Sequence, residues 1–275
     1  MKSYSVDAFV LRMRPLGEAD RVLTLFSRER GKLNAVAKGV RKVQSKFGAR
    51  LDFMTRSALA LHIGRSLDVI TGARLVGAAW SGVVEPDAYA LASYAAESID
   101  GLCEPDLPVP ELFDLLVEFQ AVLAQRPPSR EAQMAAAAAR TRASALDAMR
   151  AVMDLRMLDA LGFAPELDAC VRCGSALGHR PFAGGRAALS PEAGGLVCRR
   201  CLEAGSADAG EMRRAFDLVR LTSAQFELLR RARELSLDEA AQMPELASVA
   251  HATQAFVQHH LGRASKSLAA AGVRR

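Results

Sequence analysis

Four of the five cysteines form two Cys-x-x-Cys pairs, Cys170 with Cys173 and Cys198 with Cys201, and 24 residues separate the pairs. A Cys-x-x-Cys turn directs both thiolates toward one point, and two such turns complete a tetrahedron of sulfur around Zn²⁺. The Gly194-Gly195 pair can supply a turn between them. The spacing therefore predicts one structural Zn²⁺ held by four cysteines in a zinc-ribbon-like module.

Two other interpretations of the cysteines are weaker. A dithiol redox site normally lies in a βαβ context, which this region lacks. His179 could replace one cysteine as a ligand, but four thiolates already close the site, so we place it in a surface loop. A closed site leaves no position for water or substrate, so the predicted ion stabilises the fold rather than catalysing a reaction.

The rest of the chain carries no catalytic signature. We find no phosphate-binding glycine loop, no dinucleotide fingerprint, no nucleophile elbow and no His-x-Glu of the zinc deaminases. Cys103 stands alone and is interpreted as a small buried hydrophobe. The neighbouring His259 and His260 point in different directions on a helix, so they do not form a metal site. The sequence predicts a protein that is not an enzyme.

Length and composition suggest where such a protein works. With 275 residues, half of them hydrophobic, the chain can bury the cores of two domains. Its first residues lack the apolar region of a signal peptide, and no run of eighteen apolar residues could span a membrane. We expect a cytoplasmic protein without membrane contact, where paired cysteines hold metal more often than disulfides.

Positive charge is concentrated at the front of the chain. Residues 1–80 contain 15 Lys and Arg against 6 Asp and Glu, a net charge of +9, whereas the remainder has a net charge of −4. Within 28–56 there are nine Lys and Arg against Glu29 and Asp52. This asymmetry indicates a polyanion-binding module joined to another part; the alternative is a solvated basic surface without a partner.

The elements that would position these charges are short strands. Apolar runs within 5–75 alternate or are rich in Val, Ile, Leu and Thr, and turn residues separate them. Five strands are typical of an OB-fold barrel, and an SH3-like barrel is the competing topology. Cations on such a barrel, with Phe47 nearby, fit single-strand binding; Phe47 could stack on bases or fill the core, and we assign Phe53 to the core. Arg12 and Arg14 share one face of the first strand and could extend the groove.

The remainder of the chain predicts helices. Helical spacing covers 85–101, 111–125 and a long segment from the N-cap Ser129 to about 162; Thr222 and Gln225 form a capping box before another helix, and a last helix covers 244–261. We therefore expect an α+β multidomain fold. Residues 1–80 form an OB-fold β-barrel that binds nucleic acid, and 81–275 form an α-helical bundle carrying the zinc module at about 165–205.

Several segments resemble one known family. GEADRVLTLFSRERGKLNAVAKGVRK and SKFGARLDF near the start, LGFAPELDACVRCG and LSPEAGGLVCRRC around the cysteines, and the closing HHLGRASKSL are similar to the RecO family of bacterial recombination mediators. The resemblance is weakest in 85–150. It implies the OB-fold and zinc module described above. It also implies DNA-binding roles for Lys32, Lys38, Arg41, Lys42 and Lys46. The basic stretch adds Arg50 to these candidates, and the first strand adds Arg12 and Arg14.

The resemblance also implies activities and partners. RecO proteins bind single- and double-stranded DNA and anneal complementary strands. With RecR, and possibly RecF, they act on DNA coated by single-stranded-DNA-binding protein, whose C-terminal tail docks on the helical domain, so that RecA can load. Such a function belongs at the nucleoid. The alternative is a zinc-ribbon adaptor or transcription-associated protein, in which the ribbon, with locally basic residues such as Arg199 and Arg200, forms the working surface.

Overall fold

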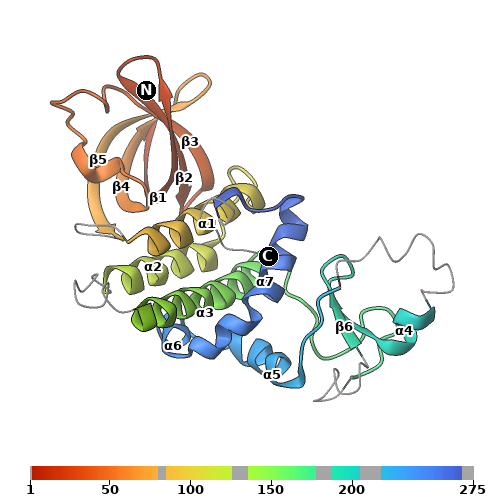
Figure 1. Ribbon diagram of the computed structural model, residues 1–275. Coiled ribbons are helices and arrows are strands. Elements are labelled where there is room, and N and C mark those ends of the chain that lie inside the picture. The colour runs from red at the N-terminus through yellow and green to blue at the C-terminus, as the bar shows by residue number, and fades with distance from the viewer. Residues whose placement is uncertain (1, 80–84, 126–135, 178–186, 205–217, 268–275) are drawn as a thin grey trace. The chain divides into compact units, whose positions relative to one another are not determined.

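The computed structural model describes residues 2–79, 85–125, 136–177, 187–204 and 218–267 (Figure 1). Packing divides the chain into two compact units. The first comprises 1–128 together with 266–271, and the second 129–265 together with 272–275. The boundary near residue 80 that the sequence suggests stays a prediction. Within the described ranges, no helix is both long enough and apolar enough to cross a membrane.

The first unit contains the predicted barrel. Its five strands are β1 Ser3–Leu16, β2 Asp20–Ser27, β3 Gly31–Ala37, β4 Thr55–His62 and β5 Asp68–Ala78. They pair in the ring order β1-β2-β3-β5-β4, and β4 pairs back to β1. All neighbours are antiparallel except β3 and β5, which meet in parallel. This Greek-key ring of five strands is the OB arrangement, so the OB prediction is confirmed.

Alternating side chains explain why these strands close on themselves. In β4 every second residue is buried, and the same inward positions recur on the other strands. A cluster that includes Val6, Leu23, Leu25, Leu59 and Leu61 fills the interior. β-bulges interrupt the registers of β1 with β2 and of β4 with β5, as strong strand curvature requires.

Two helices of the first unit pack against the barrel. These are α1 Pro86–Leu102 and α2 Pro110–Ala124, both predicted, and each begins with proline at its first position. The ring of Phe113 on α2 lies 5.3 Å from that of Phe9 and 6.4 Å from that of Phe26. The aromatic cluster therefore joins α2 to β1 and β2.

Gly31 permits the connection between the helices to approach the barrel closely. A Cβ atom at this position would lie 1.9 Å from the carbonyl oxygen of Leu107, so no other residue fits there. Its φ of +64° also favours glycine. The backbone of the turn between β2 and β3 therefore packs directly against the connection between α1 and α2.

The chain returns to the first unit near its end. The carboxylate of Glu97 on α1 accepts hydrogen bonds from the backbone N–H groups of Lys266 (3.1 Å) and Ser267 (2.9 Å). A negative side chain satisfies two backbone donors there, as an N-cap residue does within a single helix. Residues more than 160 positions apart along the chain are thus joined in one unit.

The second unit is helical, with α3 Ala136–Ala160, α5 Ser223–Ala232, α6 Leu237–Gln242, the 3-10 segment η3 Pro244–Val249 and α7 Ala250–Leu261. The predicted capping box of Thr222 and Gln225 is confirmed, and a second box, Ser236 with Glu239, was not predicted. The predicted continuous helix 244–261 is wrong in its first turns, which form η3. The predicted N-cap Ser129 lies outside the described residues.

A buried polar network holds α3 against α7. The guanidinium of Arg150, on α3 and only 4% exposed, donates to the carbonyl oxygen of Ala250 and to Gln254 on α7. The hydroxyl of Thr253 donates to the buried carboxylate of Asp154 at 2.8 Å. Because buried charges need partners, this network fixes how the two helices pack.

Candidate metal centre and nucleic-acid interface

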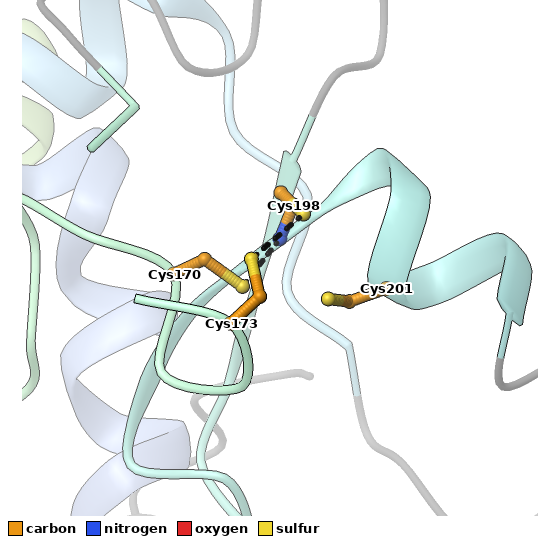
Figure 2. Close-up of side chains that lie close together, drawn as sticks. All are labelled: Cys170, Cys173, Cys198 and Cys201. Atoms are coloured by element: carbon orange, nitrogen blue, oxygen red, sulfur yellow. Dashed lines mark hydrogen bonds between the residues drawn. The ribbon is translucent and has the colours of Figure 1, made fainter. Parts of the chain in front are cut away.

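The four cysteines of the two predicted pairs come together in the second unit (Figure 2). Cys170 and Cys173 lie on a loop; Cys198 ends strand β7 (Gly195–Cys198), which pairs with β6 (Ala187–Ser190); and Cys201 lies in helix α4 (Arg199–Ala204). Their four sulfur atoms lie within 4.8 Å of one another. A tetrahedral site with metal–sulfur bonds of about 2.3 Å places its sulfurs roughly 3.8 Å apart, so small movements close the cluster around an ion.

Backbone hydrogen bonds shape the cysteine loop. The amide of Gly174, which has φ of +69°, donates to the carbonyl oxygen of Cys170, and the amide of Cys170 donates to that of Ser175. The amide of Cys198 donates to the sulfur of Cys170 at 3.3 Å. Such N–H···S bonds stabilise thiolates, so the loop is built for charged sulfur.

A second set of contacts attaches the loop to the hairpin. The amide of Glu166 donates to the carbonyl oxygen of Gly194, and the carbonyl of Glu166 accepts from the amide of Leu196. A Cβ atom at Gly195 would lie 2.4 Å from the Glu166 carbonyl oxygen, which explains the glycine. Backbone N–H groups of Asp168 and Ala169 donate to the Glu166 carboxylate and lower its pKa.

The surroundings shift the pKa values of the cysteine thiols in opposite directions. Hydrogen bonds from the Ser175 hydroxyl and amide lower the pKa of Cys173 to about 6, and thiolate charge then accumulates in the cluster. Burial and hydrogen bonds with the neighbouring sulfurs raise the pKa of Cys201 to about 12. A metal ion held by the four sulfurs would supply positive charge and favour the thiolate form of its ligands. The donor set therefore fits a metal ion with four thiolate ligands.

The predicted DNA-binding residues fall into two groups in the first unit. The first lies where the β1–β2 turn meets the connection between β3 and β4: the amide of Gly39 donates to Asp20, and the amide of Arg41 donates to the carbonyl of Ala19. The exposed cations Arg14, Lys38 and Lys42 lie in this region. No carboxylate among the described residues forms an ion pair with these three.

Other cations of this group bond to neutral acceptors. The side chain of Arg41 donates to the carbonyl of Gly17, that of Lys46 to the carbonyl of Thr71, and that of Arg50 to the carbonyls of Lys46 and Phe47. Carbonyl partners orient a cation without neutralising its charge. We call the whole set the basic rim: Arg14, Arg21, Lys38, Arg41, Lys42, Lys46 and Arg50.

Arg21 of the basic rim was not among the predicted residues. In the strand register Arg21 lies opposite Pro15 on β1 and opposite Ala37 on β3. Pro15 follows Arg14 in the sequence, and Ala37 precedes Lys38. Arg21 is the first residue of the apolar run RVLTLF, and the sequence gave no sign that it lies beside Pro15 and Ala37. The pairing of three strands places the backbone of Arg21 beside those of Pro15 and Ala37.

The second group, Arg12 and Lys32, is engaged with α1. Arg12 forms an ion pair of 2.5 Å with the carboxylate of Asp100, in the last turn of the helix. The ammonium of Lys32 donates to the backbone carbonyl oxygen of Asp100 at 2.5 Å. A cation that satisfies a C-terminal carbonyl is a favourable helix cap, so Lys32 helps to dock α1 on the barrel.

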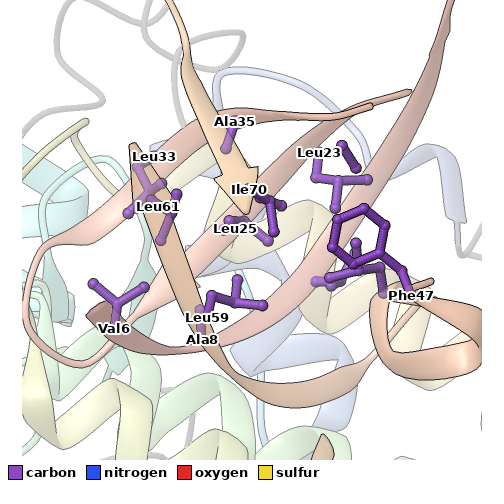
Figure 3. Close-up of a cluster of buried hydrophobic side chains, with 13 residues drawn as sticks. Val6, Ala8, Leu23, Leu25, Leu33, Ala35, Phe47, Leu59, Leu61 and Ile70 are labelled. Atoms are coloured by element: carbon purple, nitrogen blue, oxygen red, sulfur yellow. The ribbon is translucent and has the colours of Figure 1, made fainter. Parts of the chain in front are cut away.

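One of the two phenylalanines near the basic rim differs from expectation. Phe47, for which base stacking and core packing were both open, is 2% exposed and packs in the barrel core, in the same cluster as Leu51 of η1 (Gly48–Leu51); Figure 3 shows the ring of Phe47. Phe53, assigned to the core, is instead half-buried against Tyr89 of α1, with ring centroids 5.3 Å apart. The connection between β3 and β4 folds back so that Phe47 enters the barrel core, whereas Phe53 lies outside that core, against α1.

The predictions for single residues outside these sites have mixed outcomes. Cys103 is buried, as predicted, and burial raises the pKa of its thiol to about 11. His179 lies outside the described residues. The second unit also contains a cavity of about 730 Å³, which the sequence did not indicate. Its lining comprises Leu155, Arg156, Asp159, Asp168, Glu227, Arg230, Arg231, Arg233 and Glu234.

These features define a class of protein: an OB-fold barrel with a basic rim, followed by helices and a four-cysteine metal-binding module. The family model described as Recombination protein O N terminal matches residues 1–79, and that described as Recombination protein O C terminal matches residues 84–269. The chain therefore belongs to the RecO family.

Individual relatives agree with the family assignment. The protein named DNA repair protein RecO from Heliobacterium modesticaldum is 39% identical over 203 residues, which is 73% of this chain and 66%, slightly under two thirds, of that protein. Those of the same name from Frankia casuarinae and Cutibacterium acnes are each 37% identical, over 80% and 75% of this chain and 83% and 77% of their own length.

Proposed function

We propose that this protein is a recombination mediator in DNA repair that binds DNA through the basic rim and has no catalytic activity. The observation that carries the proposal is the set of exposed cations on one region of an OB barrel, with no carboxylate paired to Arg14, Lys38 or Lys42 within the described residues. Family membership supports the same conclusion.

The charge of the rim suits an annealing factor. Two complementary strands repel each other through their phosphates, and Lys or Arg contacts to phosphate reduce that repulsion while the base edges stay free to pair. Because the buried Phe47 is not available for stacking, we propose that binding rests mainly on phosphate contacts. Such binding tolerates changes of sequence and weakens steeply with salt.

The test is fluorescence anisotropy with a labelled single-stranded oligonucleotide across a salt series. The test variant replaces Lys38, Arg41, Lys42 and Lys46 with Gln, which removes four positive charges; the control replaces Arg172, Arg199 and Arg200 of the cysteine module with Gln, which removes three. We expect the rim variant to lose at least tenfold in affinity and the salt slope to fall by about 0.7 for each lost phosphate contact. If the rim variant binds as tightly as the wild type, the zinc-ribbon adaptor becomes the better hypothesis.

We further propose that the metal ion is one structural Zn²⁺ per chain. Four cysteine ligands from two Cys-x-x-Cys turns are the donor set that zinc takes in closed sites. When bound, the ion supplies charge neutralisation and a cross-link between the loop and the hairpin. Cys170, Cys173, Cys198 and Cys201 would hold it.

The partners that we propose follow from membership of the RecO family. They are single- and double-stranded DNA, RecR, possibly RecF, and the C-terminal tail of single-stranded-DNA-binding protein. With RecR the protein would help RecA to load onto DNA coated by that binding protein, in the cytoplasm at the nucleoid. An annealing assay with complementary oligonucleotides, with and without the coating protein, tests this role directly.

A further inference from the structure

The α1 side of the barrel carries cations that are paired with carboxylates of α1 and of the connection that follows it. Arg12 pairs with Asp100, and Arg30 pairs with Asp106 at 2.8 Å. Lys32 lies between the two pairs: its ammonium contacts Asp100, and its carbonyl oxygen accepts from the amide of Asp106. The three cations therefore form one row, in which Arg12 and Lys32 contact Asp100, and Arg30 contacts Asp106.

The row continues the basic rim. Arg12 and Arg14 are two residues apart on β1 and share one face of the strand, so Arg14 is both the last residue of the rim and the neighbour of the row. A phosphate backbone that follows the rim to Arg14 would next meet Arg12.

The arginines of the row can change partner. The side chains of Arg12 and Arg30 are 49% and 40% exposed, that of Asp106 is 61% exposed and that of Asp100 is 23% exposed. Exposed ion pairs contribute little net stability, and a phosphate offers a guanidinium the same paired acceptors as a carboxylate. Arg30 also lies over the ring of Tyr4, 4.8 Å from its centroid, and 3.8 Å from Asp68, which keep it in place if Asp106 leaves.

Main-chain contacts help to hold α1 and its connection on the barrel. The ammonium of Lys32 donates to the backbone carbonyl of Asp100, and the backbone amide of Asp106 donates to the carbonyl of Lys32. Neither hydrogen bond uses a carboxylate, although the carboxylate of Asp100 also lies 3.9 Å from the ammonium of Lys32. These main-chain hydrogen bonds can therefore form while a phosphate takes the place of the carboxylates beside Arg12 and Arg30.

We propose that Asp100 and Asp106 occupy phosphate positions of a latent extension of the DNA-binding surface, which a single strand reaches by displacing them from Arg12 and Arg30. The inference rests on the proposed function, because it names further residues of the same DNA site. It implies that the two aspartates limit the affinity of the protein for DNA.

The experiment measures single-strand affinity and salt slope by anisotropy for the full chain and the double variant Asp100→Asn with Asp106→Asn. The control variant, Asp87→Asn with Glu111→Gln, removes the same charge from exposed positions in the first turns of α1 and α2. We expect the D100N/D106N variant to bind at least fivefold more tightly, with a salt slope steeper by about 0.7 for each phosphate gained. Adding Arg12→Gln and Arg30→Gln should abolish the gain.

The outcomes separate this inference from the proposed function. No gain in affinity, a gain equal to that of the control, or a gain that persists without the two arginines would overturn the inference while the rim still binds DNA. If the wild-type chain does not bind and the D100N/D106N variant does, the extension is supported and the rim is not. If neither binds, both fail. If the double variant has a lower melting temperature than the wild type, the same binding measurement is made with the single variant Asp106→Asn.

Discussion

The side-chain amide of Gln120 on α2 donates a hydrogen bond of 3.0 Å to the main-chain carbonyl of Met54, just before β4. Met54 has φ of +55°, a left-handed conformation that is uncommon for a residue other than glycine, and its amide donates to the carbonyl of Val10 at 2.9 Å. The backbone carbonyl and N–H of Met54 thus both form hydrogen bonds, one with α2 and one with β1, and these bonds stabilise the strained turn.

Replacing Gln120 with Leu should destabilise the first unit by about 1–3 kcal/mol, because the buried carbonyl of Met54 would lose its donor. Urea unfolding measures the change. The matched control is Gln125→Leu at the exposed end of α2, where we expect a change within about 0.5 kcal/mol. Equal effects of the two substitutions would show that the Met54 contact is unimportant.

The positions of the two phenylalanines can be tested in the same way. Phe47→Ala should cost about 3–5 kcal/mol, since it leaves a cavity in the barrel core, and Phe53→Ala should cost clearly less because that ring is only partly buried. Thermal or urea unfolding of both variants gives the order. The reverse order would contradict the burial of Phe47.

Loss of one metal ligand should affect the second unit alone. Cys198→Ser is expected to reduce bound zinc from one ion per chain to none and to lower the melting temperature, because metal binding and folding are coupled. Metal content by elemental analysis and a melting curve provide the measurements, and Cys103→Ser, outside the cluster, should retain the ion. We expect single-strand binding by the rim to survive. A Cys198→Ser chain that keeps both its zinc and its melting temperature would disprove the structural-zinc proposal.

One histidine should make stability depend on pH. Burial, and then the neighbouring His259, lower the pKa of His260, whose ring stacks on Phe163 at 4.3 Å. In the unfolded chain His260 has an ordinary pKa of about 6.5 and binds a proton more readily than in the folded chain. The contribution of the neutral His260 to folding stability is therefore present above that pH and is lost as the pH falls. Melting temperatures at pH 7.5 and 5.5 should differ less for His260→Phe than for the wild type. Equal differences would assign the effect to other groups.

Local patterns predicted much of the fold. The five strands, the helices α1 and α2 and the Thr222 capping box follow from alternation, helical spacing and caps that each involve a few neighbouring residues. The four cysteines were found because a metal site imposes a recognisable spacing. The parallel pairing of β3 with β5, by contrast, joins distant segments and leaves no local signature.

The errors arose where a tertiary contact overrides a local pattern. The first turns of the predicted last helix form η3, where the carbonyl of Ser248 accepts a hydrogen bond from the side chain of Gln225, a partner outside the predicted helix. Phe47 is buried because its connection folds back over the barrel. Asp100, far along the chain, is the partner that engages Arg12 and Lys32. None of these contacts could be deduced from neighbouring residues.

The hydrogen bonds from Lys266 and Ser267 to Glu97 have a consequence for biosynthesis. The ribosome releases the barrel, α1 and α2 long before it translates the segment that caps them. Throughout that interval the carboxylate of Glu97 lacks the backbone N–H groups of Lys266 and Ser267 as partners, while the second unit is being synthesised. The capping of Glu97 is therefore a contact of the first unit that cannot form until residues 266 and 267 have been translated.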